Sequence, residues 1–347
     1  MENAHTINDL RQFQAMPLPV KVAMTKTRIR AWVNEYGTDG VYVSFSGGKD
    51  STVLLHIVRE MYPDIPGVFV DTGLEFPEIR DFVKTFDNII WLKPKMNFRA
   101  VLEKYGYPII SKDVAQTIHD VNTQARLKGC DKRQTGMWNR AFNPDSDYAK
   151  KYPSYSRARY DFLVDAPFQC SHYCCNIMKK DPAKEYEKES GRHVILATMA
   201  QESRLRQTQW LRDGCNAFDV KRPTSKPMSF WREQDVLQYI KENNLPIASV
   251  YGSIEFDDGD ELTGQMDIAE LGLADEVRPL KTTGQKRTGC MFCLFGCSSP
   301  EWDNLVRMKQ THPKQYDYIM RPKEQGGLNY KAIIDWINEH GNMDIRY

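Results

Sequence analysis

The stretch YVSFSGGKDST, residues 42–52, sets the fold of this chain. It begins as a short apolar, β-branched run and ends in two glycines, a lysine, an acid and two hydroxyl residues. The residues from Ser51 onward, STVLLHIVREMY, have the apolar spacing of an amphipathic helix. A glycine turn between a strand and a helix favours phosphate binding, because the first amides of a helix lack partners.

The segments that follow alternate between strand and helix patterns. PGVFVDTG (66–73) reads as a strand and turn, PEIRDFVKTF (77–86) as a helix and NIIWLKP (88–94) as a strand. This alternation predicts an α/β fold with a doubly wound, mainly parallel sheet, because parallel strands need crossover helices. Ligands of such sheets bind at the carboxyl ends of the strands, which here carry SGGKDS and DTGLE.

We expect three regions along the chain: N-terminal helices over residues 1–38, an α/β domain over 39–250, and a C-terminal region with CxxC and helices over 251–347. Residues 120–165 are polar and aromatic with weak periodicity, which predicts a long insertion or lid on a loop-like background. Residues 253–288 are acidic and then rich in glycine and threonine, which predicts loops.

Composition limits the compartment and the partners. The 47 basic and 46 acidic residues give a formal charge of +1, which argues against a general nucleic-acid coat. There is no apolar run of about 18 residues, so we expect no membrane span. The first residues lack the basic-then-apolar pattern of a signal peptide, so we expect a cytoplasmic protein. In that reducing compartment, clustered cysteines indicate metal or redox chemistry rather than disulfides.

The loop after the first strand carries the features of a phosphate site. Gly47 and Gly48 allow close backbone approach, and Lys49 adds a positive charge. This is not the P-loop of nucleoside-triphosphate hydrolases, because Val43 stands where that motif needs its first glycine. Asp50 fits a phosphate site in two ways: in the first turn of the helix, where the dipole favours an acid, or facing a Mg²⁺ ion that bridges phosphates.

The eight cysteines include two tight groups. Cys290 and Cys293 form a CxxC with Cys297 close behind, and Cys174 and Cys175 are adjacent, one helical turn after Cys170. Four thiolates can hold an iron–sulfur cluster. Zinc is the alternative, although adjacent cysteines suit its tetrahedral site less well. We interpret the remaining Cys130 and Cys215 as plain thiols.

Seven motifs give the chain a family resemblance. Together they resemble the phosphoadenylyl-sulfate (PAPS) reductase family of the adenine-nucleotide alpha-hydrolase superfamily, in family order from residue 40 to about residue 320. The motifs are SGGKDS (46–51), VFVDTGLEFPEI (68–79), YPIISKD (107–113), CCNIMKKDP (174–182), ATMAQESRLR (197–206), KPMSFWREQDVLQYI (226–240) and RTGCMFCLFG (287–296).

The resemblance implies roles for individual residues. Residues of the first motif would hold the phosphates of ATP or a PAPS-like adenine nucleotide; they are Ser46, Gly47, Gly48, Lys49, Asp50 and Ser51. Asp71, Thr72 and Gly73 would lie beside the adenosine. Lys112 and Arg204 would line the anionic end of the pocket and, with Lys49 and Asp50, form the catalytic set.

The cysteine pattern resembles the [4Fe–4S] site of adenylyl-sulfate (APS) reductases. That likeness makes Cys290 and Cys293 the firmest ligands and Cys175 the next. Cys174 and Cys297 compete for the fourth position.

Two departures from the family concern the reductase chemistry itself. Met199 stands where the family has an arginine that grips sulfate or phosphate, and a thioether cannot replace a guanidinium. The reductases attack sulfur with a cysteine near the C-terminus, and no cysteine follows Cys297 in this sequence. We therefore expect an ATP-dependent enzyme that cleaves between the α and β phosphates, adenylates an acceptor and can transfer sulfur.

The partners follow from that hypothesis. The acceptor would be a nucleic acid on the basic, aromatic 120–165 region, and a sulfur-donor protein would supply sulfur. That region offers Trp138, Arg140, Tyr152, Tyr155, Arg157, Arg159 and Tyr160. One alternative is a PAPS or APS reductase that works with thioredoxin and takes its nucleophile from Cys297 or a partner chain. Another is a non-catalytic nucleotide sensor in a larger complex. The sequence does not indicate an oligomeric state.

Overall fold

The computed structural model describes residues 5–257 and 278–347, in two compact units. The first unit contains Met1–Asp71, Glu75–Leu92 and Ala183–Thr288. The second contains Thr72–Leu74, Lys93–Pro182 and Gly289–Tyr347. Neither unit is continuous in sequence, because the chain passes between them several times. The boundaries expected after residues 38 and 250 stay a prediction.

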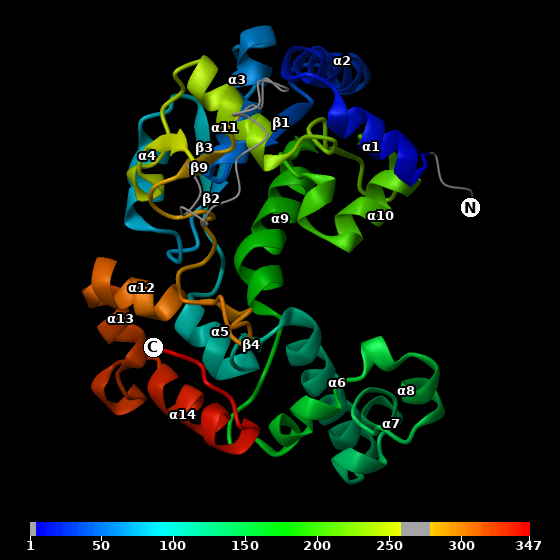
Figure 1. Cartoon of the computed structure of the whole chain (residues 1–347), viewed down its shortest axis with the longest axis vertical. Coiled ribbons are helices and arrows are strands. Elements are labelled where there is room, and N and C mark those ends of the chain that lie inside the picture. The colour runs from blue at the N-terminus through cyan, green and yellow to red at the C-terminus, as the bar shows by residue number, and fades with distance from the viewer. Residues whose placement is uncertain (1–4, 258–277) are drawn as a thin grey trace, which may run out of the picture. The chain divides into compact units, whose positions relative to one another are not determined.

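The first unit is built on a six-stranded sheet in the order β3-β2-β1-β5-β7-β6 (Figure 1). All neighbouring strands are parallel except β6 and β7. The chain runs outward from β1 to β2 and β3 and then returns to β5 on the other side, so the winding reverses between β1 and β5. The doubly wound, mainly parallel α/β fold is confirmed. The strands are β1 Val41–Ser44, β2 Gly67–Val70, β3 Ile89–Leu92, β5 His193–Ile195, β6 Asn216–Ala217 and β7 Thr224–Ser225.

Helices enclose this sheet, which explains why its central strands are apolar on both faces. In β1 the side chains of Val41, Tyr42 and Val43 are all buried. Helix α3 contacts α2, β1 and α11, and Figure 1 shows α3 and α11 close together beside the sheet. The helices of this unit are α1 Ile7–Ala15, α2 Leu18–Tyr36, α3 Lys49–Met61, α4 Pro77–Lys84, α10 Arg204–Asp213 and α11 Glu233–Glu242, and α9 Asp181–Ser190 begins in the second unit.

A small antiparallel pair occupies part of the 253–288 region. Strands β8 Ile254–Phe256 and β9 Leu280–Thr282 pair there, so the expectation of loops is wrong at both ends of the region. The side-chain amide of Gln234 accepts from the Leu280 amide at 2.7 Å and donates to its carbonyl at 2.9 Å. A side chain far away in sequence thus fixes β9. The middle of the region, 258–277, lies outside the described residues.

The second unit is mainly helical around one short parallel pair, β4 Ile109–Ile110 with β10 Leu294–Phe295. Ile109, Ile110 and Leu294 are buried there. Its helices are α5 Phe98–Tyr105, α6 Lys112–Lys128, α7 Gly136–Ala141, α8 Asp147–Lys151, α12 Asn304–Thr311, α13 Pro313–Met320 and α14 Tyr330–Gly341. Across both described ranges of the chain, no helix combines the length and the apolar character that crossing a bilayer requires.

The 120–165 region is helical, so the prediction of a loop-like background is wrong. It holds the end of α6, then α7 and α8 and three 3₁₀ turns, Lys132–Gln134, Pro153–Tyr155 and Ala158–Asp165. These pieces are too short for an apolar period to show. They begin at hydroxyl caps: Thr135 accepts from the Trp138 amide at 3.1 Å, and Ser146 accepts from the Ala149 amide at 3.1 Å. Caps of this kind stabilise a helix end by about 1 kcal/mol.

One buried hydrogen bond ties α2 to the segment before α11 and gives a stability test. The Trp231 Nε1–H donates to Thr25 Oγ1 at 2.9 Å, and both residues are fully buried. Thr25→Val keeps the shape but leaves that N–H unsatisfied, so we expect a loss of about 1–3 kcal/mol in the free energy of unfolding. Chemical denaturation measures it.

Thr27→Val is the matched control. Thr27 lies on the same helix, is exposed, and bonds only to the Ala23 carbonyl of its own helix. Its replacement should change stability by less than about 0.5 kcal/mol. Equal effects of the two substitutions would contradict the role given to the Thr25–Trp231 bond.

Candidate functional site

The loop at the carboxyl end of β1 is closed by its own hydroxyl groups. Ser46 Oγ and Ser51 Oγ are 3.0 Å apart, and Ser51 Oγ donates to the Gly48 carbonyl at 2.9 Å. Gly47 has φ +70°, and a Cβ there would lie 2.7 Å from a methyl group of Val83. Only glycine fits this turn without strain. The loop therefore has its shape before any ligand binds.

Helix α3 begins directly after this turn, with Gly48 as its N-cap and no side chain capping it. Gly48 has no side chain that could bond the first amides, which lie at the positive end of the helix, and the Lys49 backbone hydrogen-bonds with the Tyr251 hydroxyl. Lys49 is buried, with Nζ 3.2 Å from Glu233 Oε1 and 5.3 Å from the centre of the Tyr251 ring. Tyr251 in turn shares a hydrogen bond with Thr288 beside the loop.

Asp50 lies in the first turn of α3, as one of the two sequence hypotheses requires. Burial raises the pKa of its carboxyl group above the ordinary value, and the charge of Lys49 opposes this rise most strongly. The guanidinium groups of Arg287 and Arg206 act in the same direction as Lys49. An anionic carboxylate here is poorly hydrated, which suits a group that meets a divalent cation.

Glu202 holds the two arginines that sequence reasoning missed. It forms ion pairs with Arg206, one helical turn later on α10, and with Arg287 at 3.7 Å. Its carboxylate also accepts from the Met199 amide at 2.9 Å. Glu202 and Arg206 follow β5, which pairs with β1. Because Asp50 follows β1, this pairing brings the charge of Arg206 near Asp50. The motif ATMAQESRLR contains both Arg204 and Arg206, but the sequence alone does not show which of the two lies near the loop.

The other residues predicted for the nucleotide site lie apart from one another in the structure. Arg204 is exposed on α10, and the charge that reaches Asp50 comes from Arg206 instead. Asp71 is buried at the end of β2 and accepts from Arg80 at 2.8 Å. Thr72 and Gly73 fall in the second unit, where Thr72 Oγ1 accepts from the Leu74 amide at 3.1 Å. Their roles toward an adenosine stay predictions.

The two cysteine groups meet because both flank β4. On one side Ile109 and Ile110 pair with Leu294 and Phe295, within the Cys290–Cys297 segment. On the other side Tyr107 bridges to Cys170, just before Cys174 and Cys175. The chain after Cys175 forms a π-helical turn, Asn176–Lys180, a distortion often found at functional sites.

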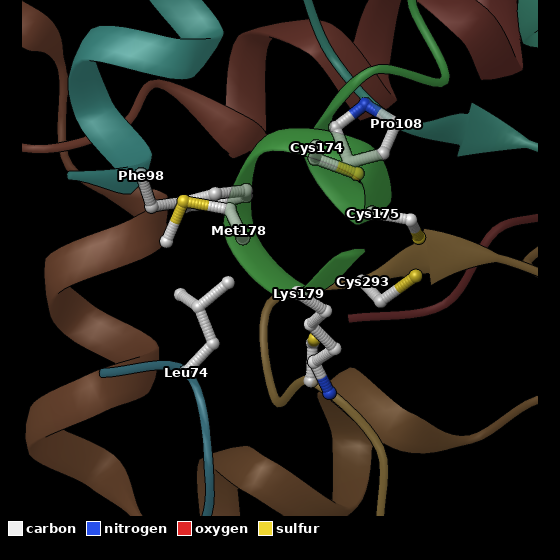
Figure 2. A pocket seen from close by; sticks show the side chains of 9 residues that line it. Leu74, Phe98, Pro108, Cys174, Cys175, Met178, Lys179 and Cys293 are labelled. Carbon is white, nitrogen blue, oxygen red and sulfur yellow. The ribbon is translucent and has the colours of Figure 1, made fainter. Parts of the chain in front are cut away.

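These segments line a small pocket with a cavity of about 20 Å³ (Figure 2). Four of the five predicted metal ligands line it, namely Cys174, Cys175, Cys290 and Cys293. The other lining residues are Leu74, Phe98, Pro108, Met178 and Lys179. Figure 2 shows Cys175 and Cys293 facing the same open space, with Lys179 nearby. Cys297 is buried and is not part of the lining.

The thiols of the pocket differ in acidity. The hydrogen bond from Cys174 lowers the pKa of Cys175 to about 6, with help from the charges of Lys112 and Lys179. The same hydrogen bond raises the pKa of Cys174. Burial raises the pKa of Cys293 to about 12. Lys112, predicted to line the nucleotide pocket, is exposed at the start of α6 and acts on Cys175 here.

The described residues hold no ready-made metal site. Within 5–257 and 278–347, no group of three or more His, Cys, Asp or Glu side chains is arranged to hold a metal ion. The four thiols therefore line a shared cavity without converging on one point. A cluster or zinc ion, and a Mg²⁺ ion at Asp50, stay predictions.

Comparison with known proteins bears on the segment around the loop. Residues 40–109 match the model of the phosphoadenosine phosphosulfate reductase domain. This segment of the chain is similar to that family. The likeness first noted in SGGKDS and VFVDTGLEFPEI is confirmed, because both motifs lie inside the matched residues.

The chain spans less than a third of the length of the curated relatives that it matches. A phosphoadenosine 5'-phosphosulfate reductase of Xylella fastidiosa is 40% identical over 65 residues, 19% of this chain and 27% of that protein. An uncharacterised protein of Methanocaldococcus jannaschii is 45% identical over 73 residues, 20% of this chain and 18% of its own. A crystal structure of PAPS reductase from Candida auris matches 73% of this chain and 96% of that one, with 15% identity and a TM-score of 0.37.

The raised pKa of Asp50 gives a test with a defined sign. Its neutral form contributes stability that is fully present below the ordinary pKa of about 3.9 and is lost as the pH rises through the folded pKa. At pH 7, without nucleotide or Mg²⁺, Asp50→Asn should therefore raise the melting temperature.

Asp81→Asn is the control, because the pKa of Asp81 is shifted in the opposite direction to that of Asp50. Its hydrogen bond from Lys84 lowers the pKa of Asp81, so removing that charge should not stabilise the protein at pH 7. Differential scanning fluorimetry across pH measures both variants. A lower melting temperature for Asp50→Asn at neutral pH would refute the raised pKa given to the Asp50 carboxyl group.

Proposed function

We propose that the chain binds ATP with Mg²⁺ at the SGGKDS loop, cleaves it between the α and β phosphates and transfers the adenylyl group to an acceptor. The observation that carries the proposal is the glycine turn before α3, whose N-cap Gly48 offers no capping side chain, beside a buried lysine. Amides at a helix N-terminus bind phosphate oxygens. The position at the carboxyl end of β1, where the sheet reverses its winding, is where such sheets bind ligands.

The charges around Asp50 support a polyphosphate rather than a single anion. Lys49 lies at the start of α3, while Arg206 and Arg287 reach Asp50 from two other segments of the first unit. Cleavage between the α and β phosphates releases pyrophosphate, whose charge develops on the leaving oxygen. Fixed cations in that position stabilise the transition state more than the substrate. Asp50 would hold the Mg²⁺ ion that shares this task.

The reaction balances without a redox partner. An acceptor oxygen attacks the α-phosphorus, the bond to the bridging oxygen breaks, and pyrophosphate leaves with the electron pair. The protein's part is to orient ATP and neutralise charge. Sulfur at the sulfide level, supplied by a sulfur-donor protein, can then displace the activated oxygen, and AMP leaves with that oxygen and the electron pair.

We propose further that the pocket of four cysteines holds a [4Fe–4S] cluster. Such clusters take four thiolates, and one cavity is lined by four cysteines from two distant segments. The pocket favours Cys174 over Cys297 as the fourth ligand, since only Cys174 lines it. With one thiolate on each iron, the bound cluster would supply electron transfer and would leave no open iron site. Zinc is the alternative group.

Metal content tests the ligand set. Protein purified anaerobically should be brown, with iron and acid-labile sulfide, and Cys174→Ser or Cys293→Ser should lose most of both. Cys297→Ser and Cys130→Ser should keep them, because neither residue lines the pocket. Loss of iron from Cys297→Ser alone would contradict the choice of Cys174, and zinc in place of iron would refute the cluster.

Pyrophosphate release tests the reaction. With ATP, Mg²⁺ and an acceptor, Lys49→Ala should lower the rate about 10²–10³-fold, as expected for removing a fixed stabilising charge. Lys26→Ala is the control, because Lys26 is also a lysine paired with a glutamate, Glu60, at 2.9 Å, but lies on α2. ATP that binds without α–β cleavage would contradict the adenylation proposal and favour a nucleotide sensor.

Sulfonucleotide reduction is the second candidate, favoured by the domain match at residues 40–109. It predicts sulfite release from PAPS or APS in the presence of thioredoxin, with no need for ATP. Met199 argues against it, because a buried thioether stands in place of the anion-gripping arginine. Sulfite formation at a rate above that of pyrophosphate release would reverse the ranking of the two functions.

A further inference from the structure

The segment α7–α8 with the 3₁₀ turn Pro153–Tyr155 carries an exposed surface that the proposed chemistry does not use. We call it the tyrosine surface and define it by Arg140, Tyr148, Lys150, Lys151, Tyr152 and Tyr155. Residues 150–155 are all exposed, and Tyr152 and Tyr155 have 39% and 58% of their area in contact with solvent. Aromatic side chains left this exposed, in adjacent turns, commonly contact a ligand.

The three rings follow one another across this surface. The centres of Tyr148 and Tyr152 are 5.0 Å apart, and those of Tyr152 and Tyr155 are 6.4 Å apart. The guanidinium of Arg140 lies 4.3 Å from the Tyr148 ring centre and donates to its hydroxyl at 3.0 Å. Lys151 Nζ lies 5.4 Å from the Tyr152 ring centre. Three neighbouring rings therefore share this surface, and the first two each have a cation beside them.

The charge of the surrounding segment is strongly positive. Residues 126–160 contain nine lysines and arginines against three aspartates. Among the residues that the structure describes, no carboxylate forms an ion pair with Arg140, Lys150 or Lys151. Their charges are thus available to an anionic partner.

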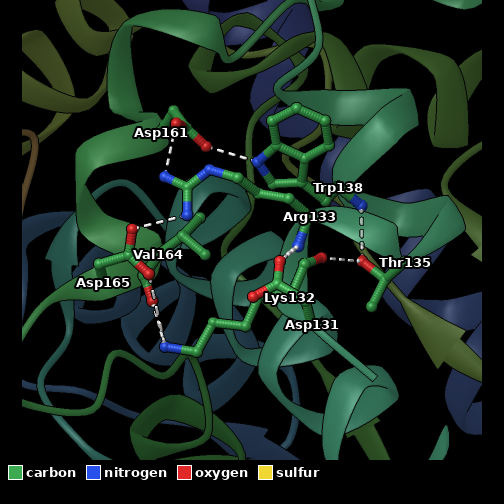
Figure 3. Close-up of polar contacts among 8 residues, drawn as sticks. All are labelled: Asp131, Lys132, Arg133, Thr135, Trp138, Asp161, Val164 and Asp165. Carbon is green, nitrogen blue, oxygen red and sulfur yellow. Dashed lines mark hydrogen bonds and ion pairs between the residues drawn. The ribbon is translucent and has the colours of Figure 1, made fainter.

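The two acids that follow the surface in sequence, Asp161 and Asp165, are already paired (Figure 3), whereas Asp145 and Asp147 lie within the segment that carries it. Arg133 pairs with Asp161 at 3.1 Å and with Asp165 at 2.7 Å. Trp138 Nε1 also donates to Asp161, and Lys132 Nζ donates to the Val164 carbonyl at 2.7 Å. This network joins the start of α7 to the turn Ala158–Asp165, and it neutralises two carboxylates that would otherwise repel a polyanion.

The tyrosine surface is held in place from beneath. Phe142 and Ala149 are buried under it, and the Arg157 amide donates to the Ala141 carbonyl at 2.8 Å. Arg157 is itself paired with Asp113 at the start of α6. A surface fixed in this way loses little conformational entropy when a ligand orders on it.

We propose that the tyrosine surface binds an unpaired stretch of nucleic acid. Exposed rings stack on unpaired bases regardless of sequence, and lysines and arginines beside them contact phosphates. The proposal deepens the proposed function by giving its acceptor a docking surface, and it rests on that function only for the chemistry that follows binding. A duplex fits poorly, because its bases are already stacked on one another. An acidic peptide would meet the cations but would leave the rings unused.

Direct binding without ATP tests the surface separately from the reaction. A fluorescein-labelled oligo(dT) of about 16 nucleotides should bind by anisotropy, and a duplex of equal length should bind at least about ten-fold more weakly. Oligo(U) should bind within a few-fold of oligo(dT), since stacking and charge do not distinguish the sugar. Tyr155→Ala should weaken binding about ten-fold, while Tyr155→Phe, which keeps the ring, should restore it.

The salt dependence separates charge from stacking. For single strands the slope of log K against log salt is about −0.7 per phosphate neutralised, so replacing Lys150 and Lys151 with alanine should flatten it by about 1.4. Lys309→Ala is the matched control, because Lys309 is equally exposed and also lies 5.4 Å from a tyrosine ring, that of Tyr316, but on α12. Its slope should not change.

Several results would overturn the proposal: no binding of oligo(dT), equal affinity for duplex, or equal affinity of Tyr155→Ala and the unsubstituted chain. The proposal would also be overturned if Lys309→Ala weakened oligo(dT) binding as much as the replacement of Lys150 and Lys151. Because Tyr155 is exposed, its substitution should leave the melting temperature unchanged, which confirms that the variant is folded. Binding of oligo(dT) by a protein that releases no pyrophosphate would support the surface and refute the reaction.

Discussion

Parallel hydrogen bonding of β1 to β2 on one edge and to β5 on the other is the constraint on which the first unit depends. It makes β1 the strand at which the winding reverses, so no crossover helix covers its carboxyl end from both sides. The turn that leaves β1 is thereby exposed to a ligand while both its flanks are packed. The SGGKDS loop has its charge, its helix N-terminus and its rigid shape at that one point.

The same pairing supplies the surrounding charges. The segment after β5 emerges beside the loop, which is why Glu202 can hold Arg206 and Arg287 near Asp50. A cluster of three cations and a buried carboxylate is costly to desolvate unless a ligand or ion shares the burial. This arrangement is the reason for proposing a polyphosphate with a divalent cation as the occupant of the loop.

Strand β4 plays the corresponding part in the second unit. Two short pairings, β4 with β10 and Tyr107 with Cys170, bring Cys174 and Cys175 to the same pocket as Cys290 and Cys293. Ile110, at the end of β4, has φ +63°, a strained conformation for a β-branched residue, and its carbonyl accepts from the Gly296 amide at 2.7 Å. Strain of this kind persists only where the surroundings fix it, and it commonly lies at functional sites.

Much of this protein could be predicted from local sequence. The alternation of strand and helix patterns, the glycine turn and the two cysteine groups are all short-range features, because propensity, φ requirements and ligand spacing act over a few residues. The sequence could not show that Arg206 rather than Arg204 faces Asp50, that Gln234 fixes β9, or that Cys174 rather than Cys297 lines the pocket. These depend on which distant segments pair side by side, and pairing is decided by the packing of the whole unit rather than by the residues that pair.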